Sequence, residues 1–293
     1  MRILMTGATG YIDAHIIMKL HELKYTVACI VRDTSDLSKI EPFTDSIIQS
    51  SSYRWEEMYP AIVDFRPDLF LHLAAFYSQG NDKETIEKLI DTNIVFPEFA
   101  VDAAWNAGCR FFINTTTYTE NFYRSHYSPC TIYAATKKAF SDLLHYYHEL
   151  GARIITLVLF DVYGRDDQRP KVLNLIRDMK DGEHIDMSSG EQKLFPVHID
   201  DITSAFIRTV ELISNDTNIC TEKYAVRGEK AYTLKEWIEL YIILSRKMPD
   251  IRWGKRQQNG MQIMDPTGYG EVLPGWIPTY DLVSGMKEYC GVE

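Results

Sequence analysis

The sequence has few cysteines, and none of them forms a recognisable motif. Its 293 residues include five cysteines that are widely dispersed along the chain. An odd, scattered set of this kind excludes a disulfide framework and a cysteine-based zinc site. Isolated thiols fit a reducing compartment, so we expect a cytoplasmic protein. The cysteines are Cys29, Cys109, Cys130, Cys220 and Cys290.

Long hydrophobic runs are also missing. No apolar run reaches the roughly 18 residues that a transmembrane helix requires, so we expect no membrane span. Only Arg2 separates the initiating methionine from the first apolar run, and neither a basic segment nor a cleavage site follows. These features argue against a signal peptide.

Positive charge is scarce. The chain has 31 Lys and Arg residues against 41 Asp and Glu residues, which gives a net charge of −10. Such a surface repels phosphate backbones and anionic lipids, so we expect neither a nucleic-acid nor a membrane partner. The eight histidines show no spacing typical of metal ligands, and we therefore expect no metal site.

What the sequence does contain is a regular alternation of apolar runs and helical patterns. The predicted strands are residues 3–5, 25–31, 46–49, 69–73, 110–114 and 153–160. The predicted helices between them are residues 11–23, 55–65, 85–107 and 132–150. Alternation of this kind predicts an α/β fold with a doubly wound parallel sheet of the Rossmann type, covered by helices on both faces.

The alternation stops after residue 160. Proline, glycine and short mixed segments follow, with helices predicted at residues 171–180, 201–213 and 234–246. We therefore predict a dinucleotide-binding domain at residues 1–161, completed by a helix at residues 200–213. Residues 162–293 would mainly form a smaller, mixed C-terminal lobe that binds the substrate. Ligands of such sheets bind at the carboxyl ends of the strands.

A glycine-rich turn, Thr-Gly-Ala-Thr-Gly-Tyr-Ile-Asp at residues 6–13, joins the first predicted strand to the first helix. Gly7 permits a tight turn, and Gly10 lets the backbone approach a diphosphate at the helix N-terminus. Two glycines at this spacing are common, but their position at the first strand–helix junction predicts a dinucleotide site.

Asp13 stands where the usual pattern has a third glycine. That glycine allows the helix to pack closely on the strand. An aspartate adds bulk and a negative charge one turn from the phosphates. We therefore expect weaker cofactor binding or a small shift of the helix.

The end of the second strand, Ile-Val-Arg-Asp at residues 30–33, bears on the choice of cofactor. A basic residue at this place accommodates the 2′-phosphate of NADP, and an acidic one binds the ribose hydroxyls of NAD. The charge and planar fork of Arg32 suit a phosphate, so we favour NADP(H). NAD(H), bound through Asp33, is the alternative.

Tyr133 and Lys137 are four residues apart and would share one face of a helix. An ammonium group beside a phenol favours the phenolate, so we expect the pKa of Tyr133 to fall below its usual value near 10. Such a tyrosine exchanges a proton near neutral pH. An isolated pair of this kind is usually a solvated helix face, so the neighbouring motifs carry the functional interpretation.

Taken together, these motifs resemble the extended short-chain dehydrogenase/reductase family. The resemblance rests on the glycine turn, the Tyr-x-x-x-Lys pair and several segments in the family's order along nearly the whole chain. The further segments are residues 67–75 (Pro-Asp-Leu-Phe-Leu-His-Leu-Ala-Ala), Asn93, residues 160–164 (Phe-Asp-Val-Tyr-Gly), residues 197–201 (Val-His-Ile-Asp-Asp) and residues 274–278 (Pro-Gly-Trp-Ile-Pro).

The resemblance implies roles for individual residues. Thr117 would hydrogen-bond the substrate oxygen, Tyr133 would transfer the proton, and Lys137 would lower the pKa of the tyrosine and bind the nicotinamide ribose. It also implies a homodimer through helices 85–107 and 132–150. The implied cofactor-binding residues are Gly7, Thr9, Gly10, Tyr11, Ile12, Arg32, Leu73, Ala74, Ala75, Asn93, Thr115, Tyr133, Lys137 and Phe160.

Three reactions compete within the family. Its dehydratases carry an Asp-Glu pair directly after the catalytic Ser or Thr, where this chain has Tyr118 and Thr119, with Glu120 one position late. Its epimerases keep NAD tightly bound, and Arg32 argues mildly against that. Residues 114–117, 128–137 and 190–192 resemble those of reductases of nucleotide-activated 4-keto-6-deoxyhexoses. The resemblance therefore implies NADPH-dependent reduction of the 4-keto group of such a sugar. The alternatives are an epimerase with tightly bound NAD and, because of Asp13, a non-catalytic dinucleotide-binding module.

A nucleotide sugar also requires groups that hold its diphosphate and its sugar. We expect Lys171 and Lys193 to bind the diphosphate, although solvated surface cations would look the same in a sequence. Asp161 replaces the asparagine usual in the family. Tyr77 and Tyr118 would line the sugar pocket, or else pack as ordinary aromatic residues. The predicted substrate residues are Tyr77, Thr117, Tyr118, Tyr133, Asp161, Lys171 and Lys193.

Overall fold

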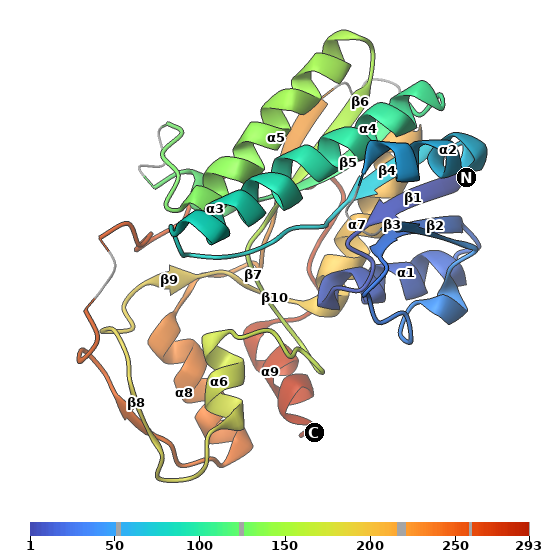
Figure 1. The fold of residues 1–293 in the computed structure, drawn as a ribbon. Helices are drawn as coiled ribbons and strands as arrows, with labels where there is room; N and C mark the ends of the chain where they lie inside the picture. Colours follow the sequence, from blue (N-terminus) through green and yellow to red (C-terminus); the bar gives the residue numbers. More distant parts are fainter. Residues whose placement is uncertain (51–53, 123–125, 216–220, 258–259, 293) are drawn as a thin grey trace.

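A computed structural model describes residues 1–50, 54–122, 126–215, 221–257 and 260–292. Its centre is an eight-stranded sheet in the order β14-β11-β6-β5-β4-β1-β2-β3 (Figure 1). All its strand pairs are parallel. The strands are β1 Arg2–Thr6, β2 Thr26–Arg32, β3 Ser46–Ser50, β4 Leu69–His72, β5 Phe111–Thr117, β6 Arg153–Leu159, β11 Thr221–Val226 and β14 Glu271–Val272.

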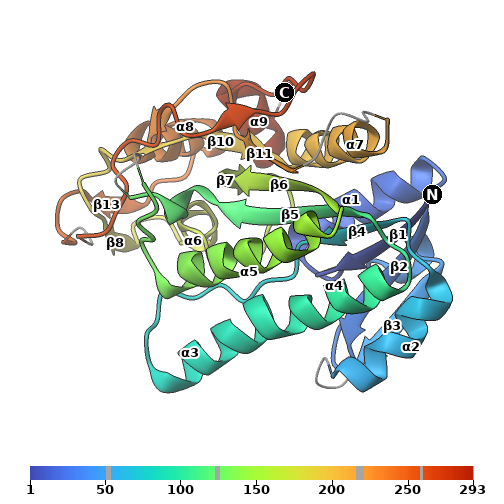
Figure 2. The ribbon, with the colours of Figure 1, turned by 90° about the horizontal axis from the view of Figure 1, so that it is seen from above.

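Helices cover both faces of this sheet, which confirms the predicted doubly wound fold. The helices α1 (Tyr11–Glu22) and α7 (Ile199–Asn215) pack on one face. The helices α2 (Trp55–Phe65), α4 (Phe96–Asn106) and α5 (Ile132–Glu149) cover the other face. Figure 2 shows α4 and α5 side by side on that second face. Side chains alternate between the two cores along each strand, because successive residues of a strand point to opposite faces.

The helix predicted at residues 85–107 is interrupted. The helix α3 (Lys83–Ile90) leads through a π-turn at Asp91–Val95 into α4. Asn93 lies in this turn and is fully buried. Its amide accepts a hydrogen bond from the Phe76 N–H (2.8 Å) and donates to the Phe76 carbonyl and to Thr136 Oγ1 (both 3.0 Å). The turn therefore fastens the loop that follows β4 onto α5.

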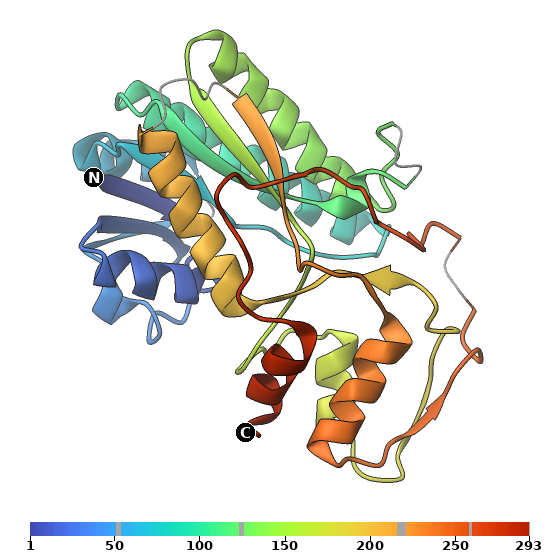
Figure 3. The same ribbon diagram turned by 180° about the vertical axis from the view of Figure 1, so that it is seen from behind.

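The C-terminal lobe is small and mixed, as predicted. Its strands pair only in twos, β10 with β7, β12 with β9 and β13 with β8, in the described part of the chain. Its helices α6, α8 and α9 group together beyond one end of the large sheet (Figure 3). The elements are β7 Asp161–Tyr163, α6 Val172–Asp178, β8 His184–Asp186, β9 Lys193–Leu194, β10 Pro196–His198, β12 Tyr232–Thr233, α8 Leu234–Ser245, β13 Asp250–Arg252 and α9 Leu282–Cys290.

The boundary between the two parts is less simple than the predicted break at residue 161. Both β11 and β14 come from the predicted lobe segment, yet they extend the large sheet next to β6. The strand β11 begins Thr-Glu-Lys, and a polar start of this kind hides the strand from a hydrophobicity pattern. The sheet is therefore assembled from both halves of the sequence.

Within the described residues, no helix is long and apolar enough to cross a membrane. The same residues contain no cluster of three or more side chains suited to a metal ion. Cys29, Cys109, Cys130 and Cys290 are free thiols, and Cys220 lies outside the described residues.

Candidate active site

The glycine turn adopts the conformation that its sequence predicts. Gly7 has a φ of +85°, which favours glycine, and its carbonyl accepts a hydrogen bond from the Gly10 N–H (2.8 Å). A Cβ at Gly7 would lie 2.6 Å from the Ala74 nitrogen, so the loop after β4 packs directly on the turn. Gly10 precedes α1 without a side-chain cap, which leaves the first amides of that helix for an anion. Thr9 is exposed beside them.

Asp13 occupies the concave side of this turn. Only 7% of the residue is exposed, and its Oδ1 has no hydrogen-bond partner in the described structure. Cβ atoms built on Gly7 and on Gly10 would both collide with its carboxylate. Burial raises the pKa of Asp13 to about 8. The carboxyl group thus lies where the backbone of the turn would face a diphosphate.

The predicted catalytic helix, α5, begins at Ile132, one residue before Tyr133. The Thr131 side chain caps it by accepting the Ala134 N–H (3.1 Å). Lys137 follows one turn after Tyr133, is 1% exposed, and its Nζ has no hydrogen-bond partner among the described residues. The Asn114 amide donates to Ser141 Oγ, which donates to the Lys137 carbonyl (both 3.0 Å). These bonds hold the helix against the middle of β5.

The electrostatics of the pair differ from the expectation. Burial lowers the pKa of Lys137 to about 8, against opposing effects of Glu120 and Asp13. Burial also raises the pKa of Tyr133 above its usual value, with smaller contributions from Tyr77 and Glu120. The prediction that the tyrosine pKa is lowered is therefore wrong for this structure, because the loss of hydration on burial raises it. Tyr133 is protonated at neutral pH, which is the form that donates a proton.

Thr117 ends β5 and is half-buried, as a substrate-facing hydroxyl should be. Its Oγ1 accepts the Thr119 N–H (3.3 Å) and lies 3.0 Å from Thr119 Oγ1. Glu120, one residue further, is 1% exposed and binds Lys223 Nζ on β11 at 2.7 Å. Sequence reasoning missed this ion pair, since the two residues are 103 positions apart.

A buried polar cluster supports the loop of Leu73, Ala74 and Ala75. Thr6 Oγ1 lies 2.7 Å from His72 Nδ1 and accepts the Ala74 N–H at 3.4 Å. Thr115 Oγ1 donates to the His72 carbonyl at 3.2 Å. Burial lowers the pKa of His72 well below its usual value, so the ring is neutral. His72 was not predicted as a site residue, and its place at the end of a buried strand was the available signal.

These residues fit a dinucleotide at its nicotinamide and adenosine ends. The buried, unpartnered Nζ of Lys137 suits the hydroxyls of a nicotinamide ribose. Arg32 is exposed at the carboxyl end of β2, two residues beyond Ile30, which pairs with Thr6 of β1. At the diphosphate, between these two ends, the site fits the cofactor when Asp13 is neutral. An ionised Asp13 carboxylate would repel the diphosphate.

Tyr11, in the first turn of α1, connects the glycine turn to the second lobe. Its hydroxyl donates to the Arg165 carbonyl (2.8 Å), and the Arg169 guanidinium lies 4.7 Å above its ring. Arg169 in turn binds both carboxylate oxygens of Asp167 (both 2.7 Å). Ile12, the next residue, is half-buried against the hydrophobic core between the sheet and the helices α1 and α7. The contact between Tyr11 and Arg165 spans 154 residues and has no local sequence signal.

An aromatic cluster lies on the substrate side. The Tyr118 ring stacks on Phe160 with centroids 4.7 Å apart, and its hydroxyl donates to Asp161 Oδ1 at 3.3 Å. Asp161 Oδ2 accepts the Phe195 N–H at 3.3 Å. Burial raises the pKa of Asp161. Phe160, predicted to contact the cofactor, is 5% exposed and packs inside this cluster.

The remaining predicted substrate residues are in different surroundings. Tyr77 is exposed, and its ring meets that of Tyr133 edge-on at 5.0 Å. Lys171 Nζ donates to the Val162 carbonyl (3.0 Å), and burial lowers its pKa to about 8. Lys193, on β9, forms an ion pair with Asp265 at 2.9 Å. Lys171, which precedes α6, is therefore held against β7, whereas the charge of Lys193 is paired with that of Asp265.

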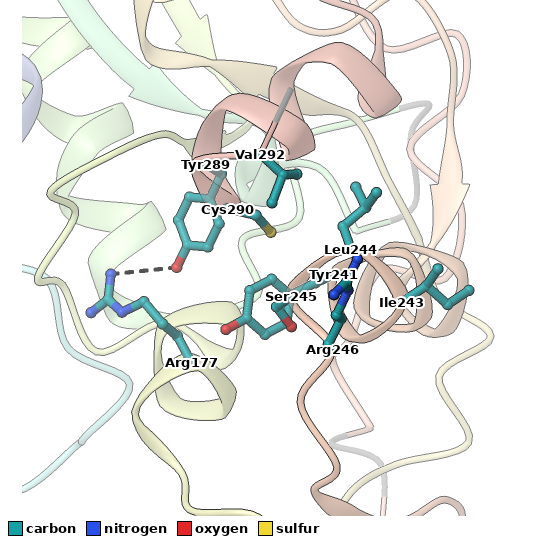
Figure 4. Close-up of a pocket in the computed structure, with 9 residues that line it drawn as sticks. All are labelled: Arg177, Tyr241, Ile243, Leu244, Ser245, Arg246, Tyr289, Cys290 and Val292. Atoms are coloured by element: carbon teal, nitrogen blue, oxygen red, sulfur yellow. Dashed lines mark hydrogen bonds between the residues drawn. The ribbon is translucent and has the colours of Figure 1, made fainter.

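An open hollow of about 690 Å³ lies elsewhere, between α8, α9 and the end of α6 (Figure 4). In Figure 4 the Arg177 side chain points to Tyr289, with which it shares a hydrogen bond of 3.4 Å. The hollow is lined by none of the predicted site residues. Its lining residues are Arg177, Tyr241, Ile243, Leu244, Ser245, Arg246, Tyr289, Cys290 and Val292.

Two CDP-abequose synthases are similar to this chain in sequence. CDP-abequose synthase from Salmonella muenchen is 25% identical over 100% of this chain and 98% of its own length. The enzyme of that name from Yersinia pseudotuberculosis is 29% identical over 80% of this chain and 82% of its own length.

Solved structures share the fold. A UDP-glucose 4-epimerase from Thermotoga maritima, solved with UDP-glucose, has a TM-score of 0.83 at 20% identity, covering 99% of this chain and 98% of its own. A UDP-glucuronic acid 4-epimerase from Bacillus cereus, solved with NAD and a substrate analogue, has a TM-score of 0.81 at 20% identity, with the same coverage. The model of the NAD dependent epimerase/dehydratase family matches residues 3–220. The chain belongs to the NAD dependent epimerase/dehydratase family, which confirms the resemblance to the extended short-chain dehydrogenase/reductases.

Proposed function

We propose that this protein catalyses the NADPH-dependent reduction of the 4-keto group of a nucleotide-activated 4-keto-6-deoxyhexose. One observation carries the proposal. Lys137 is buried one helical turn from Tyr133, and its Nζ has no hydrogen-bond partner among the described residues. Both side chains interact electrostatically with Glu120, three residues after Thr117. A buried ammonium without a partner is costly, so its retention here fits a ligand that completes its hydrogen bonds.

Each of the three residues has a chemical task in a reduction. The bound nicotinamide would supply the hydride. Tyr133, whose raised pKa keeps it protonated, donates its phenolic proton to the developing alkoxide oxygen. Thr117 Oγ1 donates a hydrogen bond to the same oxygen and so orients the ketone. Lys137 holds the ribose and stabilises the phenolate that the proton transfer leaves behind.

The surroundings of Glu120 argue against dehydration. Elimination of water requires an acid and a base next to the catalytic threonine, but positions 118 and 119 are Tyr and Thr. Glu120 itself is engaged by Lys223 at 2.7 Å, on the side of β11. Glu120 is thus bound to Lys223 and stands one position late for that role, whereas reduction needs no further group.

Two observations favour this substrate class: the sequence relatives and the side chains of the C-terminal lobe. A CDP-abequose synthase matches the full chain, which directs attention to CDP-linked sugars. In the lobe, the Lys171 ammonium lies beside the half-buried Asp161, near the aromatic cluster of Tyr118 and Phe160. A cation next to an aromatic wall suits a diphosphate and a sugar, with Asp161 accepting from a sugar hydroxyl.

The test is an NADPH absorbance assay with CDP-, dTDP-, GDP- and UDP-linked 4-keto-6-deoxyhexoses. We expect NADPH loss with one nucleotide class and a fall of at least about 10²-fold in rate for Tyr133→Phe, with little change in NADPH affinity. A fully active Tyr133→Phe variant would refute the proposed role. Tightly bound NAD in the denatured protein, together with no net cofactor use, would identify the epimerase alternative instead.

We further propose a homodimer formed by α4 and α5. Both helices keep large apolar side chains exposed, including Phe99 (36%), Leu143 (38%) and Tyr146 (63%). Exposed apolar surface, where it is contiguous, commonly marks an interface. Light scattering should give twice the chain mass, and Tyr146→Glu should reduce it to one chain. Ile243→Glu, at an exposed position of α8, is the matched control and should leave the mass unchanged.

A further inference from the structure

Asp13 combines deep burial with the absence of a partner. It is 7% exposed, its Oδ1 has no hydrogen bond in the described structure, and its carboxylate lies against both Gly7 and Gly10. It also stands in the first turn of α1, which has no side-chain cap. The group is therefore aimed into the concave side of a turn whose free amides suit an anion.

The groups that face Asp13 do not neutralise it. Arg169, from the segment after β7, and Lys137, from α5, attract its charge, and both effects are smaller than that of burial. Arg169 is already bound to Asp167 through two hydrogen bonds of 2.7 Å. On β2, the pKa of the Cys29 thiol is itself raised by burial and by Asp13, so this neighbour is a neutral thiol. Burial accordingly raises the pKa of Asp13 to about 8, so its titration falls within the pH range of ordinary binding experiments.

The two protonation states have opposite effects on a diphosphate at this turn. An ionised carboxylate repels the phosphate oxygens and can only accept hydrogen bonds. A neutral carboxyl removes that repulsion and provides an O–H donor, which can bond to a phosphate oxygen. The glycine usual at this position can do neither.

We propose that Asp13 takes up a proton from solvent when a dinucleotide binds, and that its carboxyl O–H then donates to the diphosphate at the turn of Gly7 and Gly10. The inference rests on the proposed function, because it requires dinucleotide binding at this turn. It makes the affinity for the cofactor fall as pH rises, through a residue that replaces a glycine.

The experiment is calorimetric titration with NADPH at about pH 7 and about pH 9, in pairs of buffers with different ionisation enthalpies. The proteins are the wild type, Asp13→Asn, which mimics the neutral carboxyl, and Asp13→Gly. With a pKa of about 8, the free wild type holds its proton roughly 90% of the time at pH 7 and 10% at pH 9. We therefore expect about 0.8 more protons taken up per NADPH at pH 9 than at pH 7.

The dissociation constant should rise about tenfold more between these pH values in the wild type than in Asp13→Asn. Asp13 raises the pKa of Lys137, so the difference between wild type and Asp13→Asn reports Asp13 together with its coupling to Lys137. NADPH binding with equal proton uptake in wild type and Asp13→Asn would overturn this inference alone. Binding by none of the three proteins would overturn both the inference and the proposed function.

Discussion

Replacing Asp13 by asparagine should stabilise the protein by an amount that grows with pH. The folded pKa of about 8 lies far above the usual 3.8. A raised folded pKa means that the neutral carboxyl contributes stability, which is fully present below the unfolded pKa and is lost as pH rises through the folded one. Asp13→Asn keeps the shape of the side chain and removes the titration.

The magnitude follows from the pH window. Between about pH 5 and pH 8 the wild type loses about 1.4 kcal/mol per pH unit from this one group, or about 4 kcal/mol in total. Relaxation of the helix N-terminus and water entry reduce that figure. We therefore expect the difference in unfolding free energy between Asp13→Asn and wild type to grow by about 2 to 4 kcal/mol from about pH 5 to about pH 8.

Urea unfolding followed by circular dichroism at each pH gives this difference, with one common m-value for both proteins. Asp33→Asn is the control, because Asp33 is an exposed carboxylate near the same end of the sheet. Its difference from wild type should stay within about 0.5 kcal/mol at every pH. A pH-independent difference for Asp13→Asn would show that Asp13 is ionised and solvated, and would refute the reasoning about burial.

Two further predictions concern cofactor choice and the ion pair beside the site. Arg32→Ala should weaken NADPH binding by roughly 10- to 100-fold while changing NADH binding little, because one charge-assisted bond to the 2′-phosphate is lost; equal losses for both cofactors, measured by fluorescence titration, would contradict this role. Lys223→Met should destabilise the protein by about 2 kcal/mol near pH 8, because Glu120 is left buried without its partner. The loss should shrink near pH 5, since burial raises the pKa of Glu120 and protonation removes the unpaired charge. Glu120→Gln in the same protein should restore most of the urea-unfolding free energy, and a Lys223→Met variant as stable as wild type at pH 8 would count against the pair.

Much of the architecture could be predicted because its signals are local. The glycine turn between β1 and α1, the alternation of strands and helices, and the spacing of Tyr133 and Lys137 are all short-range patterns. The π-turn at Asp91–Val95 was not predicted, since a helical periodicity looks continuous across one inserted residue. The strand β14 is two residues long and carries no pattern of its own.

The site was harder to predict wherever burial decides the chemistry. The spacing of Tyr133 and Lys137 suggested that the ammonium lowers the tyrosine pKa, but neither exposure nor hydration can be read from spacing. The same limit applies to Asp13, whose position showed a charge near the phosphates and not that the carboxyl would be buried without a partner. Contacts such as Glu120 with Lys223 depend on strands brought together by the whole sheet.

Transfer of a labelled hydride tests the central claim most directly. The purified protein would be incubated with NADPH carrying deuterium at the transferable position and with each of the CDP-, dTDP-, GDP- and UDP-linked 4-keto-6-deoxyhexoses. We predict that mass spectrometry finds one deuterium at carbon 4 of a reduced sugar from one nucleotide class, and that Tyr133→Phe forms this product at least about 10²-fold more slowly. Absence of deuterium from every sugar, with NADPH bound but unconsumed, would contradict the assignment as a 4-ketoreductase.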